Sequence, residues 1–488
     1  MRHVETRPGL YRDSVALMQI SSALSRLPAV ASALVAMATE LNLDLLAQMG
    51  FEPPAGAGPT DMLVAIETAD PSLMADVLSL LESELAGPTS VSRQSTVEVA
   101  PRTTGSAARL FDASVVVVST PGRYAFVEAM DALDAGASVM VFSDNVPLAQ
   151  EIRLKQVATE RGLLVMGPDC GTAVVGGVGL GFANVVRPGP VGLVAASGTG
   201  AQQVMSLLST VAGAGISHCL GVGGRDLSAD VGGVSTRAAL AMLDDDPSTE
   251  LIVVLGKPPA PSVAASLRAF SEAKATPVEF APLGLGQPDL TAIAESVLSR
   301  LGLPVPSWPS FAPPVRRAPS PGSVRGLFSG GTLCVEAMVL ASEALGPIRS
   351  NIAVRPEWTL SGDGADGHIM LDLGSDEYTV GRPHPMIDFG PRLSLLRSAS
   401  ASAECRVVLL DVVLGHGAHP DPASELAPVI AEALDRVAPL DVVVSLVGTP
   451  DDPQDVTRQA AALVDAGAWV FASNAVAVRH AVSLVGAA

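Results

Sequence analysis

Basic and aromatic side chains are scarce in this sequence. Only 3% of its 488 residues are Phe, Trp or Tyr, and 30 Lys and Arg stand against 50 Asp and Glu, a formal net charge of −20. Nucleic-acid binding needs a basic face and often aromatic stacking platforms. The composition therefore predicts no nucleic-acid partner, and a phosphate site would depend on backbone donors and a few Arg residues.

Cysteine is also rare, and long apolar runs are missing. The four cysteines are far apart and form no CxxC pair, which argues against a disulfide framework or a zinc site and predicts single buried thiols. No uncharged apolar run reaches the roughly 18 residues of a membrane span. The chain opens without a basic-then-apolar leader, because Arg2–Arg7 is followed by Pro8-Gly9. We therefore expect a cytoplasmic location and no membrane partner.

What the chain does contain is enough apolar surface for several domains. Hydrophobic residues make up 48% of the sequence and the mean hydropathy is +0.40. At roughly 150 residues each, the length corresponds to about three domains. The longest apolar stretches, such as 115–118 and 407–410, are short and rich in β-branched residues. They are typical of buried strands in a parallel sheet, so the predicted fold class is α/β.

The order of patterns predicts the domain organisation. A small α+β unit (1–88) is followed by a polar connector (87–105), a Rossmann-like domain (106–188), a flavodoxin-like domain (189–302), a proline-rich linker (303–322) and a second flavodoxin-like domain (323–488). Expected helices lie at 15–27, 41–49, 73–85, 125–135, 148–161 and 263–273. Expected strands lie at 31–38, 62–66, 113–119, 138–142, 163–166, 191–195, 216–222, 251–255 and 277–280. No GxGxxG motif is present in the Rossmann-like stretch, so nicotinamide binding has no support.

The last domain repeats the order of the domain before it. A strand, a Ser-Gly loop and a helix come first in both, at 191–208 and 324–340. The runs Gly221–Asp226 and Leu371–Asp376 then correspond, as do the apolar strands 251–255 and 407–411. This shared order favours an internal duplication, although any two α/β domains resemble each other to some extent.

The two Ser-Gly loops are the most informative motif. One is Ser197, Gly198, Thr199 and Gly200, and the other is Ser329, Gly330, Gly331 and Thr332. A strand that turns through small residues into a helix presents free N–H groups and a positive dipole end to an anion. We therefore predict a phosphate or carboxylate gripped by both loops, while simple N-capping is the alternative for the two serines.

Other polar side chains follow predicted strands and are weaker candidates. Arg225 and Lys257 are possible anion contacts. The alternative for Arg225 is an ion pair with Asp226 that fixes the loop, and the alternative for Lys257 is a solvated side chain. His416, His419 and Asp421 are the best acid–base candidates, and His419 is the more constrained histidine. A structural turn is the alternative for them. We expect no metal, because Pro420 and Pro422 forbid a helix here and no third ligand is evident.

Several runs together resemble the FdrA family of the succinyl-CoA synthetase superfamily over essentially the whole chain. These runs are Gly167-Pro-Asp-Cys-Gly-Thr172, Leu180-Gly-Phe-Ala-Asn184, Ala196–Gly200, Gly223–Asp226, Lys257-Pro-Pro259, Leu327–Cys334, His384-Pro-Met-Ile-Asp388 and Gly415-His-Gly-Ala-His-Pro-Asp-Pro422. The resemblance implies a CoA-binding-type domain at 106–188 and two ligase-type domains after it, joined by the linker. Thr120, Pro121, Arg123 and Asn145 would then line a CoA-like pocket.

The resemblance also implies that this chain has lost the phosphohistidine of the synthetases. In the synthetases a phosphohistidine swings between two helix starts, which would here be the Ser197 and Ser329 loops. The corresponding loop, 281–287, contains no histidine. His218 is expected to be a core residue, and no segment fits an ATP-grasp domain.

The family association predicts an activity without that histidine. FdrA-type proteins are linked to a multi-subunit oxamate carbamoyltransferase, in which phosphate splits oxalurate into oxamate and carbamoyl phosphate in purine (allantoin) nitrogen catabolism. Phosphate or carbamoyl phosphate would be substrates, the other subunits would be partners, and carbamate kinase would act downstream. The alternatives are an acyl-CoA synthetase-like or CoA-binding protein, with CoA as a possible ligand, and a non-catalytic scaffold.

Overall fold

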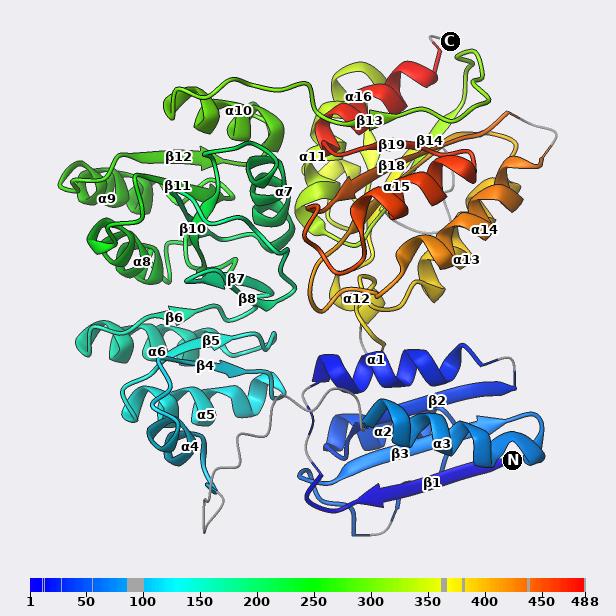
Figure 1. Ribbon diagram of the computed structural model, residues 1–488, viewed down its shortest axis with the longest axis horizontal. Coiled ribbons are helices and arrows are strands. Elements are labelled where there is room, and N and C mark those ends of the chain that lie inside the picture. Colours follow the sequence, from blue (N-terminus) through cyan, green and yellow to red (C-terminus); the bar gives the residue numbers. More distant parts are fainter. Residues whose placement is uncertain are drawn as a thin grey trace. The chain divides into compact units, whose positions relative to one another are not determined.

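The structure is a computed structural model of the 488-residue chain. It describes all residues except 11, 13, 28, 55, 86–100, 361–366, 380–381, 437–438 and 487–488. Most of the predicted connector at 87–105 therefore lies outside the described residues. The chain forms two compact units, which are Met1–Arg102 with Tyr378–Asp388 (unit 1), and Thr103–Glu377 with Phe389–Ala488 (unit 2). Both are drawn in Figure 1.

Unit 1 contains an antiparallel sheet with strand order β1-β3-β2, covered by helices on both faces. Its elements are β1 (Arg2–Arg7), α1 (Ser14–Ser25), β2 (Val30–Met37), α2 (Glu40–Gln48), β3 (Met62–Thr68), η1 (Pro71–Leu73) and α3 (Met74–Leu85). Side chains alternate along β3, so Val64 packs with α1 and α3 whereas Leu63 packs with α2. The predicted small α+β unit is confirmed. Its first strand was not predicted, because β1 is mostly polar and charged.

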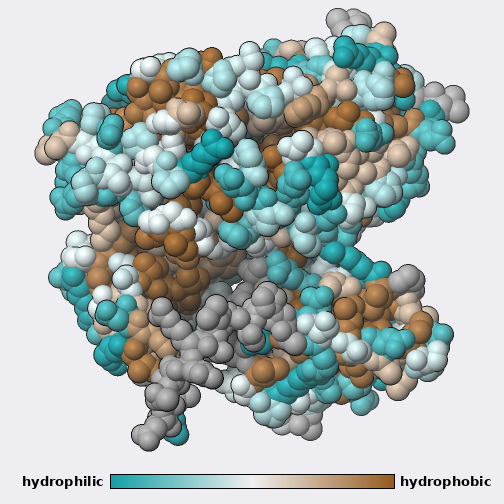
Figure 2. Space-filling model, viewed as in Figure 1, coloured by the Kyte–Doolittle hydropathy of each residue, from teal (hydrophilic) through white to brown (hydrophobic). Residues whose placement is uncertain are grey.

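Unit 2 begins with a parallel sheet of order β4-β5-β6, as the Rossmann-like pattern predicts. The elements are α4 (Thr104–Leu110), β4 (Val115–Val118), α5 (Gly122–Asp134), β5 (Ser138–Val141), α6 (Leu148–Glu160) and β6 (Val165–Met166). The hairpin of β7 (Thr172–Val175) and β8 (Val178–Gly181) joins the next sheet instead. Exposed apolar side chains include Phe111, Val117 and Val127, and Figure 2 shows brown apolar side chains among the teal ones over this part of unit 2.

The next sheet has the order β12-β11-β9-β10-β7-β8. Its further elements are β9 (Val191–Ala195), α7 (Gly198–Ser209), β10 (Ile216–Gly221), α8 (Val234–Asp245), β11 (Leu251–Gly256), α9 (Pro261–Glu272), β12 (Val278–Pro282) and α10 (Leu290–Arg300). β9 and β11 are buried along their whole length, as expected of central parallel strands. The strand order 2-1-3-4 of β9 to β12 is that of a flavodoxin-like fold.

The last sheet repeats this order. It runs β13-β19-β18-β17-β14-β16-β15, so β18-β17-β14-β16 corresponds to β12-β11-β9-β10. The elements are β13 (Ser310–Phe311), β14 (Ser323–Phe328), α11 (Gly331–Leu345), β15 (Ile348–Arg349), η2 (Pro356–Trp358), β16 (His368–Asp372), α12 (Asp376–Thr379), α13 (Gly390–Ala401), β17 (Cys405–Val413), α14 (Pro422–Leu434), β18 (Asp441–Val447), α15 (Val456–Asp465), β19 (Trp469–Phe471) and α16 (Asn474–Leu484). The predicted α/β architecture with two flavodoxin-like domains is confirmed.

Individual side chains test the burial predictions. All four cysteines are buried free thiols, as predicted. His218 is not a core residue, because its side chain is 24% exposed and its Nε2 lies 3.2 Å from Asp246. The strand β10 turns this position toward the Gly176 N–H, which donates to His218 Nδ1. Among the described residues, no helix is long and apolar enough to cross a membrane.

Candidate functional site

The two Ser-Gly loops meet in unit 2. Ser197 caps α7, where its Oγ accepts the Gly200 N–H at 3.1 Å, and the same Oγ lies 2.6 Å from Thr332 Oγ1 at the start of α11. A Cβ atom at Gly330 would lie 2.5 Å from Thr199 Oγ1, so this glycine allows the close approach. The helix starts that the sequence singled out are therefore in direct contact.

Backbone donors remain available where the helices meet. Within the described residues, the N–H groups of Gly198 and Thr199 in α7 and of Gly331 and Thr332 in α11 have no hydrogen-bond partner. The first N–H groups of a helix cannot be satisfied inside it, and the helix dipole makes that end positive. Four N–H donors on two touching helix starts make this region attractive to an anion.

Lys257 lies beside these helix starts. It follows Gly256, whose added Cβ would lie 2.8 Å from the Cβ of Ala196, the residue before Ser197. In the described part of the chain, Lys257 makes no hydrogen bond or ion pair, and its charge lowers the pKa of Asp372. It is thus an exposed cation at the carboxyl end of β11 without a fixed partner.

The second loop is partly occupied by a carboxylate from the chain itself. Asp411, fully buried in β17, accepts the Ser329 N–H at 2.7 Å, the Ser329 hydroxyl at 2.9 Å and the Gly330 N–H at 3.0 Å. Arg392, which is also fully buried, donates to the same carboxylate at 3.1 Å. Ser329 and Gly330 therefore hold an internal anion, and Gly331 and Thr332 are the members of this loop with free N–H groups.

A second carboxylate borders the same helix start. Asp372 Oδ2 would lie 2.9 Å from a Cβ added at Gly331, and its Oδ1 accepts the Gly374 N–H. Burial raises the pKa of Asp372 to about 6, with a further rise from Asp411, while the Gly374 N–H and Lys257 oppose it. The protonation midpoint of this carboxyl therefore lies near pH 6.

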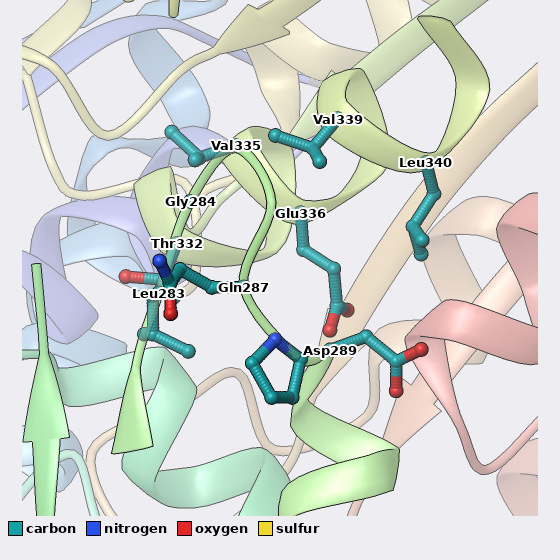
Figure 3. Close-up of a pocket in the computed structure, with 10 residues that line it drawn as sticks. Leu283, Gly284, Gln287, Asp289, Thr332, Val335, Glu336, Val339 and Leu340 are labelled. Atoms are coloured by element: carbon teal, nitrogen blue, oxygen red, sulfur yellow. The ribbon is translucent and has the colours of Figure 1, made fainter. Parts of the chain in front are cut away.

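The loop at 281–287 also lies against α11. Leu283 N–H donates to the Gly256 carbonyl, and Leu283 and Gly284 line a small cavity of about 30 Å³ together with Thr332. Figure 3 shows Glu336 pointing from α11 toward Asp289 in this cavity. Glu336 accepts the Leu290 N–H at 2.6 Å and Asn474 Nδ2 at 2.7 Å. Burial raises its pKa to about 7.

Arg225 and Asp226 have structural partners. Arg225 Nε lies 2.8 Å from Glu151, and its guanidinium donates to the Val146 carbonyl. Asp226 does not pair with Arg225 but with the fully buried Lys155, at 2.8 Å, and it also caps the start of α8. The loop is therefore held to α6 by two separate ion pairs, and not by the expected pair between Arg225 and Asp226.

The three acid–base candidates form a packed turn. His419 is 1% exposed, lies 3.2 Å from Glu425 and stacks on Phe389 with ring centroids 5.1 Å apart. Asp421 pairs with Arg458 and Gln459, whose hydrogen bonds lower its pKa against the opposing effect of burial. The prediction that the prolines prevent a helix across His416 and His419 is confirmed, because 414–421 is not helical and α14 begins only at Pro422, a first helical position that needs no N–H donor.

His416 serves to join two sheets. It is exposed, and its backbone pairs with Ala183. Next to that pair, Asn184 donates to the Leu414 carbonyl and to Asp452 at 2.8 Å, inside the protein. These bonds tie the loop before β9 to the domain of β17.

The residues predicted to line a CoA-like pocket lie at the start of α5 and in the loop before α6. Pro121 is the N-terminal flanking residue of α5, and Asn145 has a positive φ of 52° in the loop before α6. Arg123 lies over the Tyr124 ring, at 4.8 Å. Thr120 Oγ1 is buried without a hydrogen-bond partner in the described chain, which suits a polar ligand group.

A group of carboxylates includes Asp144, which directly precedes Asn145. Asp144, Asp169 and Asp376 influence one another, and burial together with the other two raises the pKa of Asp169 to about 6. Negative charge near these residues disfavours phosphate groups there. The residues described do not include a cluster of metal ligands.

Sequence reasoning missed the groups that shape the second loop. Asp411, Arg392 and Asp372 were not singled out. A signal for Asp411 does exist, since it is the one charged residue within the apolar run 407–414. A lone carboxylate in a buried strand must find partners inside the protein. Glu336 gave the same signal, because it is the one charged residue within the apolar stretch 326–342, and it was missed as well.

Comparison with known proteins identifies the superfamily. A family model described as "CoA-ligase" matches residues 327–484, and one described as "AllF, heavy metal-associated domain" matches residues 1–101. Succinate–CoA ligase [ADP-forming] subunit alpha 2 of Archaeoglobus fulgidus is 30% identical over 31% of this chain and 52% of its own length. The solved dinucleotide-forming acetyl-coenzyme A synthetase 1 of Ca. Korarchaeum cryptofilum aligns with 76% of this chain and 84% of its own at 17% identity, with a TM-score of 0.28.

The heavy-metal description does not fit the residues present. Residues 1–101 contain no cysteine, so the soft thiolate ligands that heavy metals favour are missing there.

The "Uncharacterized protein YahF" of Escherichia coli (strain K12) is 36% identical over 96% of this chain and 95% of its own length. This chain therefore belongs to the YahF family, within the CoA-ligase-like superfamily.

Proposed function

We propose that this chain is a CoA-ligase-type acyl-transfer protein that binds an acyl phosphate where α7 and α11 meet. The observation that carries the proposal is the contact between Ser197 and Thr332, which brings four free N–H groups together beside Lys257. An acyl phosphate carries a dianionic group that such donors stabilise. A chain with a net charge of −20 would otherwise repel this ligand.

The same groups favour the transfer step. A nucleophilic acceptor forms a bond to the acyl carbon, the bond from that carbon to the phosphate oxygen breaks, and the electron pair leaves with phosphate. Lys257 and the helix N–H groups face the oxygen on which negative charge grows, and fixed donors of this kind lower the barrier. The acceptor proton passes to solvent. No histidine is needed, which agrees with its absence from 281–287.

The proposal leaves a choice of acceptor for the acyl group. When bound, CoA supplies a thiol as the acceptor, and the loops of Thr120 and Asn145 would hold its uncharged arm. The relatives named as CoA ligases support this choice. The finer prediction of carbamoyl transfer, with carbamoyl phosphate as the acyl phosphate and oxamate as the acceptor, remains within the same chemistry. Its partner subunits and a downstream carbamate kinase also remain predictions.

The proposal is tested by isotope exchange on the purified chain. Labelled inorganic phosphate is incubated with acetyl phosphate or carbamoyl phosphate, with CoA or oxamate as acceptor. We expect exchange of label into an acyl phosphate, and a loss of about tenfold or more in Lys257→Met, since a charged hydrogen bond is removed. Lys274→Met is the matched control, because Lys274 pairs with Asp244 away from the loops.

Two results would contradict the proposal. One is the absence of exchange with every acyl phosphate and acceptor, which would favour the scaffold alternative. The other is exchange that does not depend on Lys257. Exchange with oxamate but not with CoA would select carbamoyl transfer, and the reverse result would select the ligase-type reaction.

A further inference from the structure

Lysine is rare in this chain, and only one of its three lysines has an unpaired side chain. Lys155 is fully buried and pairs with two carboxylates. The side chain of Lys274 is 18% exposed, and its Nζ lies 3.7 Å from Asp244. Lys257 is exposed and makes no hydrogen bond or ion pair within the described residues. Of the three lysines, all of which the structure describes, Lys257 alone therefore offers a free amine.

The backbone at Lys257 is held in place on both sides. The carbonyl of the preceding residue, Gly256, accepts the Leu283 N–H at 2.8 Å. The next two residues, 258–259, are prolines, and a proline restrains its own φ as well as the conformation of the residue before it. The side chain of Lys257 therefore starts from a fixed point at the carboxyl end of β11, whereas its ammonium group is free to move.

The charge of Lys257 acts at the start of α11. Burial raises the pKa of Asp372, and the positive charge of Lys257 opposes that rise. Asp372 Oδ2 would lie 2.9 Å from a Cβ added at Gly331, whose N–H is one of the four free donors. In an acyl phosphate the acyl carbon is one bond away from the bridging oxygen. A lysine that contacts a phosphate group at these donors would therefore also be close to the acyl carbon.

We propose that Lys257 is a modification site, to which an acyl phosphate bound at the two helix starts transfers its acyl group. This assignment rests on the proposed function, because it needs the phosphate group to be held beside the amine. The unprotonated Lys257 Nζ forms a bond to the acyl carbon, the bond from that carbon to the phosphate oxygen breaks, and the electron pair leaves with phosphate. The amine proton passes to solvent. Two groups held together in one site react much faster than the same groups free in solution.

The modification removes the cation of the anion site. Its product is an amide, which carries no charge and no longer forms an ion pair with phosphate. Calorimetry on the acylated chain should therefore show phosphate binding weakened about tenfold, the factor expected for the loss of one charged hydrogen bond. Prolonged exposure to an acyl phosphate would thus inactivate the site that binds it.

The test compares two acetylating reagents on the full chain. Acetyl phosphate carries the phosphate group that the site would hold, whereas acetic anhydride carries none and reports the intrinsic reactivity of each lysine. Mass spectrometry of proteolytic peptides measures acetylation at Lys257 and at Lys274, which is the internal control. We expect the ratio of Lys257 to Lys274 labelling to be about tenfold higher or more with acetyl phosphate than with acetic anhydride. Saturating inorganic phosphate should remove this excess.

Two glycine variants examine the same excess. Gly330→Ala should lose it, because the new Cβ would lie 2.5 Å from Thr199 Oγ1 and would separate the helix starts. The matched control Gly224→Ala, whose new Cβ would meet nothing within 4 Å, should keep it. Competition by inorganic phosphate on the unaltered chain tests the proposal even if Gly330→Ala fails to fold.

The results separate this proposal from the proposed function. Equal labelling ratios for the two reagents would overturn the modification site, as would an excess that inorganic phosphate does not reduce. Either result leaves the proposed function standing if calorimetry shows phosphate binding that depends on Lys257. If phosphate does not bind, the anion site and the modification site that rests on it are both overturned.

Discussion

Replacing Asp411 by Asn should destabilise unit 2 strongly. The Asp411 carboxylate accepts three hydrogen bonds from Ser329 and Gly330 and pairs with Arg392, and none of these groups reaches solvent. Asn keeps the shape but carries no charge, and its amide would face N–H donors. Arg392 would remain buried without its anion. Removing one partner of a buried ion pair costs about 3–5 kcal/mol.

The assay is thermal unfolding followed by circular dichroism. For a domain of about 150–250 residues, such as the flavodoxin-like domain at 323–488, about 1 kcal/mol shifts the midpoint by roughly 2–4 °C, so we expect the midpoint of its transition to fall by roughly 6–20 °C. The exposed Asp465→Asn is the matched control and should stay within about 2 °C. The double variant Asp411→Leu with Arg392→Met should recover most of the loss, because it leaves no buried charge unpaired. An unchanged midpoint in Asp411→Asn would refute the reasoning.

Three further predictions follow from single contacts. Gly330→Ala should separate the helix starts and weaken phosphate binding, because the new Cβ would lie 2.5 Å from Thr199 Oγ1. Calorimetry should show normal phosphate binding in the control Gly224→Ala, whose new Cβ would meet nothing within 4 Å. The pKa of Glu336 rises from 4.5 to about 7 on folding, so between these pH values the folded state retains a proton that the unfolded state releases. The free energy of unfolding should therefore fall by on the order of 3 kcal/mol as pH rises from about 4.5 to 7. Denaturant unfolding across this range should show a flatter profile for Glu336→Gln, and an equal slope would contradict the assignment. Ser197→Ala should cost about 1 kcal/mol through loss of the helix cap and should speed hydrogen exchange at the Gly200 amide, and unaltered exchange would count against the cap.

The fold was largely predictable from local patterns. Buried strands such as β9 and β11 are continuous apolar runs, and the helices between them have regular spacing. The shared strand order of the two flavodoxin-like domains followed from the repeated loop motif. β1 was missed because a polar edge strand lacks an apolar run, and the β7–β8 hairpin was missed because its pairing with β10 is a long-range choice.

The candidate site was predictable only in part. The Ser197 and Ser329 loops were recognised from their residues, and their contact agrees with the expected pairing. The sequence did not reveal which anion each loop holds. Asp411 lies 82 residues after Ser329 and comes close to it only because β17 pairs with β14 in the sheet. His419 looked reactive as a sequence motif, but it is buried, it contacts Glu425 six residues along the chain, and it stacks on Phe389, a tertiary contact that the motif does not reveal.

The central claim is that an oxyanion binds where α7 and α11 meet, beside Lys257. The most direct measurement is a crystal structure of the full chain with arsenate, a phosphate analogue that anomalous scattering locates. We predict an anomalous peak at these helix starts, with arsenate oxygens within hydrogen-bonding distance of the Thr199 and Thr332 N–H groups and of Lys257 Nζ. A map with no peak at these helix starts, at an arsenate concentration that saturates binding in solution, would contradict the account.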